Sequence, residues 1–94
     1  PVPSGCGSTD YSTIFDEQVF PFIQNFHPDL LIISAGFDAH RNDPLAGINL
    51  EADDFVYMAK RCLEIQPNLL LGLEGGYDLG TLEACCMTVA ACLL

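Results

Sequence analysis

Positive charge is the scarcest property of this 94-residue sequence. Three Lys and Arg residues stand against thirteen Asp and Glu residues, which gives a formal net charge of −10 with His neutral. The sequence has no basic stripe, so it predicts no direct binding to nucleic acid, which requires clustered Lys and Arg. The acidic balance favours a cationic partner, such as a lysine-rich tail or a polyamine, or simply a well-solvated surface.

Long apolar runs and paired cysteines are also missing. No apolar run approaches the roughly 20 residues of a membrane span, so no membrane segment is expected. The five cysteines are odd in number and lack CxxC spacing, which argues against a disulfide framework. We expect most of them to be small core residues in a reducing compartment, the cytoplasm or the nucleus. Because the sequence begins with Pro1 and ends without a helix stop signal, both ends are expected to be cut.

Hydrophobic periodicity first predicts a helix. After a loop rich in Pro and Gly at 1–8, Thr9 or Asp10 is expected to cap this helix. We expect Pro21 to kink or break the helix and His27 to end it. Its apolar residues recur at spacings of three and four and predict one buried stripe: Tyr11, Ile14, Phe15, Val19, Phe22, Ile23 and Phe26.

The remainder of the sequence alternates strands with helices. Apolar runs at 30–33 and 69–73 predict two strands buried on both faces of a parallel sheet. A loop from 35 to 49 and a helix starting near Glu51 separate them, and a third helix follows the second strand. This order predicts the α/β class, a right-handed crossover and a single unit over residues 1–94.

Two polar turns, at 34–40 and 73–78, follow the two predicted strands. Functional groups collect beyond the carboxyl ends of parallel strands, so Asp38 and Tyr77 are expected to converge there. A carboxylate is a suitable zinc ligand, and a phenol can donate a hydrogen bond to a developing oxyanion. Gly75 and Gly76 permit unusual backbone angles or close contact with a substrate. A metal on one side and a phenol on the other would polarise an amide carbonyl.

The motifs in these turns carry a resemblance to a known family. SAGFDA at 34–39 with DPLAG at 43–47 resembles a signature of class II-type histone deacetylases, and LEGGYDL at 73–79 resembles their catalytic-tyrosine loop. PVPSG at 1–5 is similar to the loop before the matching helix. The resemblance therefore covers essentially the whole sequence. It implies part of the three-layer arginase/deacetylase fold, with a central parallel sheet, and one catalytic Zn²⁺ as cofactor.

The resemblance also implies roles for single residues. Asp38 corresponds to the last of three zinc ligands, and Tyr77 corresponds to the catalytic residue that stabilises the tetrahedral intermediate. The implied reaction is hydrolysis of the acetyl amide of acetyl-lysine in histones or other proteins, by a water bound to zinc. The substrate channel is expected to be formed in part by Gly75, Gly76, Phe37 and Leu45.

This sequence departs from the family pattern by lacking the paired histidines and the Asp-x-His ligands. A catalytic zinc site usually has three protein ligands, so the chain alone is expected to be inactive. One alternative is a truncated binding or regulatory module. Another is a deacetylase of small acetylated amines, which Leu45 disfavours because polyamine-preferring relatives place an acid there. An arginase-type hydrolase is disfavoured by the Gly-Gly-Tyr turn.

Other polar residues near the motifs receive simpler interpretations. His40 is expected on the rim of the pocket rather than on the metal, and His27 is expected to be structural because it precedes a strand. Glu74 is expected to make local hydrogen bonds, and Asp43 is expected to organise its loop. For Phe37, a position in the core is the alternative to a position in the channel.

Overall fold

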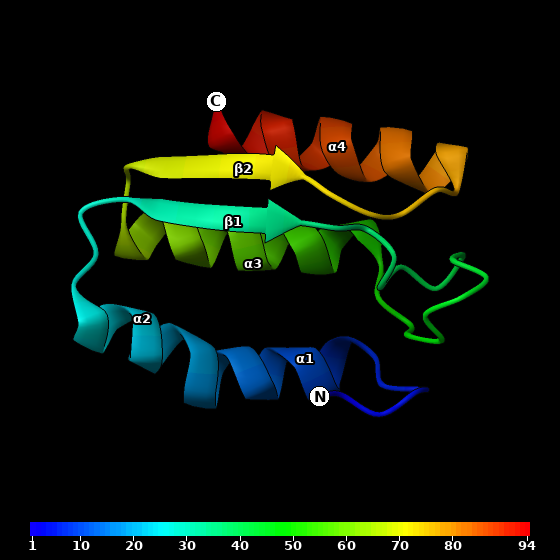
Figure 1. Cartoon of the computed structure of the whole chain (residues 1–94), viewed down its shortest axis with the longest axis horizontal. Helices are drawn as coiled ribbons and strands as arrows, with labels where there is room; N and C mark the ends of the chain where they lie inside the picture. The colour runs from blue at the N-terminus through cyan, green and yellow to red at the C-terminus, as the bar shows by residue number, and fades with distance from the viewer.

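The two strands of the sheet lie side by side and run in the same direction. β1 (Leu31–Ala35) pairs with β2 (Leu69–Leu73), with Leu31 opposite Leu69. In Figure 1 the chain passes along β1, returns behind the sheet through α3 (Ala52–Ile65) and enters β2 next to β1. This is the expected right-handed crossover. The computed structural model describes the whole chain, and it confirms the α/β class.

The amino-terminal helix is continuous and contains one π-helical turn. It consists of α1 (Ser8–Ile14), the π-helical turn η1 (Phe15–Val19) and α2 (Phe20–Phe26). The backbone N–H of Phe20 donates to the carbonyl of Phe15, five residues earlier. Pro21 follows directly; it has no N–H, and its ring crowds the carbonyl four residues before it, which a wider turn accommodates. The expected kink or break at Pro21 is thus replaced by a widened turn.

The start of this helix also differs from the expectation. Gly7 is the N-cap, in place of Thr9 or Asp10, and its backbone N–H donates to Asp10 Oδ2 at 2.9 Å. Asp10 therefore stabilises the helix start from inside the first turn, where a negative charge is favourable. At the other end His27 adopts a left-handed conformation, with φ of 52°, and ends the helix as expected.

The π-helical turn changes which aromatic residues reach the interior. Phe20 is 1% exposed, whereas Phe22 and Phe26 are each 74% exposed, so the expected buried stripe is wrong for these two residues. A π-helical turn holds more residues than an α-helical one, and residues spaced by four remain on one face across it. That face consists of Tyr11, Phe15, Val19 and Ile23, which line one apolar groove.

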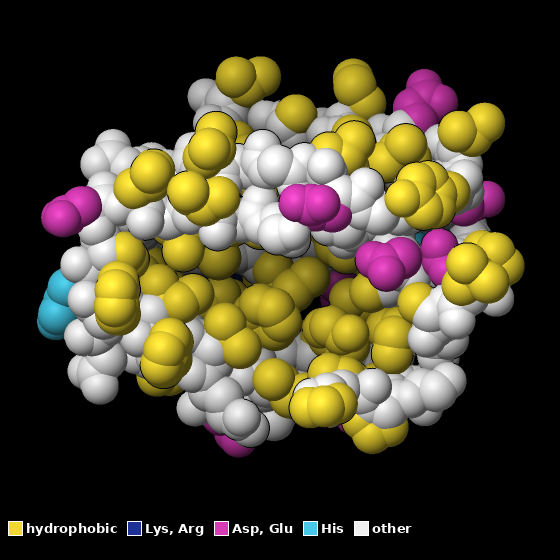
Figure 2. Space-filling model, in the orientation of Figure 1, with side chains coloured by type: hydrophobic (Ala, Val, Ile, Leu, Met, Phe, Trp, Pro, Cys, Tyr) yellow, Lys and Arg dark blue, Asp and Glu magenta, His cyan; other side chains and the backbone are white.

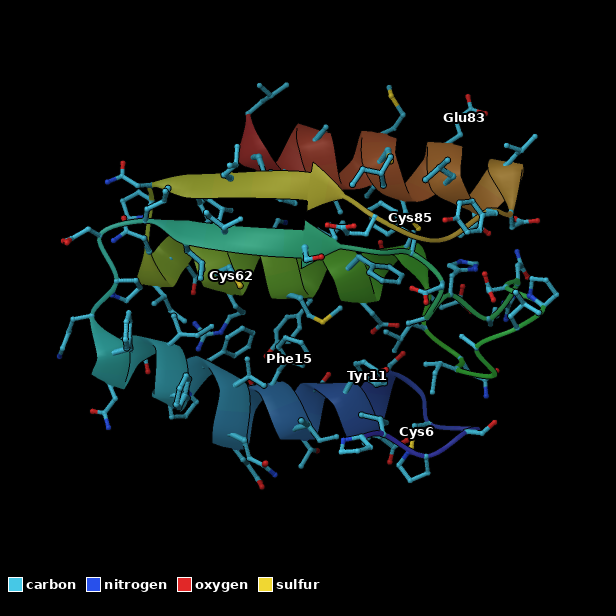
Figure 3. All side chains as sticks on the ribbon, in the orientation of Figure 1. Cys6, Tyr11, Phe15, Cys62, Glu83 and Cys85 are labelled. Atoms are coloured by element: carbon cyan, nitrogen blue, oxygen red, sulfur yellow. The ribbon has the colours of Figure 1, made fainter.

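This apolar groove, with a volume of about 350 Å³, lies between the amino-terminal helix, β1 and α3. Tyr11 and Phe15 point from the helix towards the sheet in Figure 3, and Figure 2 shows hydrophobic side chains lining the hollow. The sheet has only two strands, and the free edge of β1 faces this helix in Figure 1. The groove therefore runs beside a strand edge whose backbone has no strand partner.

The two faces of the sheet differ in burial. The helices α3 and α4 (Leu79–Leu93) pack on each other and share a core cluster against which Leu71 of β2 packs. Side chains alternate across a strand, and on the opposite face Ile32 is 64% and Leu70 is 56% exposed. The expectation that both faces are buried is wrong for this chain, because α3 and α4 cover the same face.

The cysteines are distributed between the core and its margin. All five are free thiols; Cys62 and Cys85 are buried, whereas Cys6, Cys86 and Cys92 are half-buried. Burial, together with the neighbouring Cys86, raises the pKa of the Cys85 thiol from 9.0 to about 11. Cys62 and Cys85 thus have the expected core role.

Candidate functional site

The turns that follow β1 and β2 are in direct contact. The backbone N–H of Glu74 donates to the carbonyl of Ala35 at 2.9 Å, and that of Phe37 donates to the carbonyl of Gly75 at 3.0 Å. These bonds continue the parallel pairing beyond the ends of both strands. The expected convergence of the two turns is therefore confirmed, and Figure 1 shows them beyond the arrowheads.

Gly76 allows the turns to approach this closely. Its φ is +99°, and a Cβ on it would lie 2.8 Å from the carbonyl carbon of Phe37 and 2.9 Å from the backbone nitrogen of Asp38. At Gly36 a Cβ would lie 2.9 Å from Asp38 Oδ1, the end of a side chain that can rotate away, so this position is less restricted than Gly76. Gly75 is not restricted in this way: its Cβ would meet Asp38 Cγ at an ordinary 3.9 Å. The expected unusual backbone angle is therefore found at Gly76 and not at Gly75, and contact of either glycine with a substrate stays a prediction.

Asp38 and Tyr77 both lie at this junction with their side chains exposed. The Asp38 carboxylate lies beside Gly36 and Gly75, and Tyr77, the residue after Gly76, is 81% exposed. The phenol of Tyr77 is thus held by the path of its backbone rather than by packing of its ring. The junction offers a carboxylate and a phenol, which can bind a cation and donate a hydrogen bond.

The backbone that follows Tyr77 is fixed by the start of α4. Asp78 is the N-cap, and its Oδ2 accepts the backbone N–H of Thr81 at 2.9 Å. Hydrogen bonds from the Thr81 side chain and backbone, and then the charge of His40, lower the pKa of the Asp78 carboxyl. This cap was not predicted from the sequence, although Asp78 and Thr81 have the spacing of an N-cap residue and the backbone N–H that it accepts.

His40 is buried, and its expected position on the pocket rim is wrong. It is 7% exposed, and its Nδ1 lies 3.3 Å from Thr81 Oγ1 and accepts the backbone N–H of Asn42 at 3.2 Å. Its Nε2 faces Glu51 Oε2 at 3.8 Å. The ring therefore joins the loop after β1 to the starts of α3 and α4.

Phe37 and Leu45, both expected in the channel, lie in contrasting surroundings. Phe37 is 4% exposed and packs edge-on against Phe55, with ring centroids 5.1 Å apart. It has the core position given as its alternative. Leu45 is 88% exposed on a loop in which Asp43 Oδ1 accepts the backbone N–H groups of Leu45 and Ala46. Asp43 therefore organises the loop as expected.

Tyr11 is a second tyrosine close to this junction, although its spacing in the sequence predicted only a place in the buried stripe of the first helix. Burial raises the pKa of its phenol, and the nearby Cys6 and Asp38 raise that pKa further. In Figure 3 Cys6 and Tyr11 lie close together at the start of α1. No sequence signal distinguishes Tyr11 from the other aromatic residues of its helix.

Comparison with known proteins places this junction in a family. Residues 1–93 match the histone deacetylase domain. The chain belongs to the histone deacetylase family. It is 46% identical to slr0245, an uncharacterized protein of Synechocystis, over 80 residues. These residues cover 85% of this chain and 26% of that protein. It is 40% identical to histone deacetylase 10, chloroplastic, of Oryza sativa subsp. japonica over 89 residues. These residues cover 89% of this chain and 20% of that protein.

Solved structures of histone deacetylases share the fold of this chain. The HD domain of HDA15 superposes with a TM-score of 0.94 at 36% identity, over 98% of this chain and 26% of that one. The histone deacetylase Clr3 superposes with a TM-score of 0.92 at 32% identity, over 97% of this chain and 16% of that one. The chain thus has part of the arginase/deacetylase fold, as expected, and spans about a quarter or less of these histone deacetylases.

The chain on its own does not contain a complete set of metal ligands. No group of three or more His, Cys, Asp or Glu side chains in the chain could hold a metal ion. The exposed Asp38 carboxylate at the junction is of the kind that can serve as an oxygen ligand for zinc.

Proposed function

We propose that this chain is the carboxyl-terminal part of a zinc-dependent deacetylase domain that hydrolyses acetyl-lysine in histones or other proteins. The observation that carries the proposal is the contact between the two turns. Gly76 packs on the backbone of Phe37 and Asp38, so a carboxylate and a phenol flank one junction. Membership of the histone deacetylase family supports the same reading.

Each residue at the junction has a separate task in this proposal. Bound zinc supplies Lewis-acid activation of water and of the acyl carbonyl. Asp38 contributes a carboxylate ligand, and the remainder of the domain contributes the other ligands and the general base. The Tyr77 phenol donates a hydrogen bond to the acyl oxygen as negative charge develops on it. Gly75 and Gly76 shape the wall of the substrate channel in this proposal, Gly76 by letting the two turns approach each other.

The surface around the junction suits a lysine side chain. Figure 2 shows acidic and hydrophobic side chains together at the end of the molecule beyond the strands. With a net charge of −10, this surface attracts basic segments such as histone tails. Leu45 is exposed and uncharged, so it can contact the methylene chain of acetyl-lysine but cannot pair with a polyamine cation. Acetylated protein is therefore the preferred substrate, and chromatin regulation is the implied process.

The compartment proposed for this activity is the cytoplasm or the nucleus. All five cysteines are free thiols, which suits a reducing environment. None of the helices combines the length and apolar character needed to cross a membrane.

A chimeric enzyme tests the proposal. In this chimera, the chain replaces the matching 26% of the HDA15 HD domain, with which it superposes at a TM-score of 0.94. Zinc content and hydrolysis of an acetyl-lysine peptide are measured for the chimera, the unmodified domain and the 94-residue chain. We expect the chimera to bind zinc and turn over, and the chain alone to do neither.

Two variants of the chimera separate the roles of the carboxylate and the phenol. Tyr77→Phe is expected to keep zinc and lower kcat by about 10²–10³-fold, as for the loss of one oxyanion donor. Asp38→Asn is expected to lose zinc. The matched controls are Tyr57→Phe, whose phenol donates to Asp16, and Asp29→Asn, an exposed carboxylate before β1; both should retain zinc and turnover.

Two results would contradict the assignment. Full turnover after Tyr77→Phe would remove the tyrosine from the chemistry, and full zinc content after Asp38→Asn would remove the ligand. A folded chimera without zinc or turnover, beside an active unmodified domain, would instead favour a binding or regulatory module.

A further inference from the structure

We propose that His40 is a positioning residue that couples the turn carrying Asp38 to the turn carrying Tyr77. The inference rests on the proposed function of those two residues. His40 itself does not touch the substrate in this proposal. It acts through Thr81 and the start of α4 on one side and through the loop after β1 on the other.

The imidazole ring of His40 is fixed in place by burial and by polar contacts at both nitrogens. His40 is 7% exposed, and both ring nitrogens face polar partners from different parts of the chain. Nδ1 accepts the Asn42 N–H at 3.2 Å and lies 3.3 Å from Thr81 Oγ1, while Nε2 faces Glu51 Oε2 at 3.8 Å. Because a backbone N–H donates to Nδ1, the hydrogen of the neutral ring is on Nε2. The Nδ1 atom of His40 therefore has to act as a hydrogen-bond acceptor in this position.

On the side of Asp38, the backbone of His40 closes the turn. Its N–H donates to the carbonyl of Phe37 at 3.1 Å, and its carbonyl accepts the N–H of Asp43 at 2.9 Å. Asp38 lies inside the turn that the first of these bonds closes. These bonds use backbone atoms, which a substitution of the side chain retains, so they fix the ring of His40 relative to the turn that presents the Asp38 carboxylate.

On the side of Tyr77, the contact of His40 is with the first turn of α4. Thr81 places its hydroxyl against the ring, while its backbone N–H donates to Asp78 Oδ2 at 2.9 Å. Asp78 directly follows Tyr77, whose 81% exposed ring has little packing of its own. The direction of the phenol therefore depends on this capped backbone, and His40 is the side chain that joins it to the turn of Asp38.

The alternative is that His40 merely fills space in the core. Kinetics of the chimera distinguish the two readings. His40→Leu removes both ring nitrogens, whereas His40→Asn keeps an acceptor at the δ position. Likewise, Thr81→Val removes the hydroxyl and Thr81→Ser keeps it. We expect His40→Leu and Thr81→Val to lower kcat by roughly 10–100-fold, the scale of a small misplacement of a catalytic group, with KM and zinc content unchanged. The conservative variants should restore most of the loss.

A double-mutant cycle with Tyr77→Phe then tests the route. If His40 acts by orienting the phenol, His40→Leu should lower kcat little further once the phenol is absent. Equal loss with and without the phenol, loss of zinc, or no loss of kcat in His40→Leu would overturn the inference. A different result, full activity of the Tyr77→Phe single variant, would contradict the proposed function, so the two failures can be told apart.

Amide hydrogen exchange on the 94-residue chain supplies a readout without activity. In His40→Leu, we expect the amides of Thr81 and Leu82 to exchange at least about tenfold faster, with those of β1 and β2 unchanged, because local opening exposes only the loosened segment. His27→Leu, at the opposite end of β1, is the control and should change neither. Uniform acceleration throughout the chain would show a purely structural role, and unchanged exchange at Thr81 would show no coupling; either result overturns the inference.

Discussion

Gly76→Ala is the substitution that the junction should tolerate least. The methyl group would lie 2.8 Å from the Phe37 carbonyl carbon, which is backbone and cannot rotate away, and the φ of +99° is unfavourable for alanine. The left-handed region alone costs roughly 1–2 kcal/mol for a residue with a Cβ. Separating the two turns to relieve the overlap adds to this, so we expect unfolding free energy to fall by about 2–4 kcal/mol.

Gly75→Ala is the matched control one residue earlier. Its added methyl group would meet Asp38 Cγ at 3.9 Å, and its φ is not positive, so the folded state has room for it. Alanine also reduces the conformational freedom of the unfolded chain, which can stabilise by roughly 0.4–1 kcal/mol. We therefore expect a change of less than about 1 kcal/mol in either direction.

Urea unfolding followed by far-ultraviolet circular dichroism measures both variants against the parent chain. The slope of free energy against urea should remain constant, so that the midpoints report stability. If Gly76→Ala lowers the free energy of unfolding no more than Gly75→Ala does, the argument that close backbone contact fixes the junction is refuted.

Two further predictions concern the core and the open sheet face. The pKa of the Cys85 thiol is about 11 in the folded chain against an ordinary 9.0, so its contribution to stability is complete below pH 9.0 and is lost as pH rises towards 11. Urea midpoints should fall over this window, and fall less in Cys85→Ala; parallel curves would contradict this assignment. Ile32 and Leu70 expose apolar surface on a strand face, so the parent chain should self-associate with concentration in sedimentation velocity, and Ile32→Lys with Leu70→Lys should not. A parent that remains monomeric over the same concentrations would show that this face is not adhesive.

The strands and their turns could be predicted because their signals are local. Each apolar run is short and continuous, each is followed by a polar turn with Gly, and parallel strands bring such turns to one edge of the sheet. The structure places Phe37 N–H on the Gly75 carbonyl in agreement with this reasoning. The roles of Asp38 and Tyr77 depend on resemblance in addition, since exposure of both side chains is equally compatible with an ordinary surface.

The π-helical turn could not be predicted from apolar spacing. Spacings of three and four fit an ordinary helix, and Phe22 and Phe26 fit the stripe as well as Ile23 does. The aromatic residues that face the sheet depend on where the helix widens to relieve the crowding caused by Pro21. The hydrogen bond from the Phe20 N–H to the Phe15 carbonyl sets that place. The sequence predicts that Pro21 disturbs the helix, but it does not predict that the disturbance is a π-helical turn.

His40 shows the same limit at the site itself. In sequence it is the last residue of a polar turn, two residues after Asp38, and a histidine there suggests a rim position or a second metal ligand. In the fold it is buried against Thr81, which lies on a later helix and is brought to the ring by the pairing of β1 with β2 and the contact between the two turns. A partner so distant in sequence leaves no periodic or spacing signal. The side chains that define the candidate chemistry are therefore visible in local motifs, whereas the side chain proposed to align them emerges only from the assembled fold.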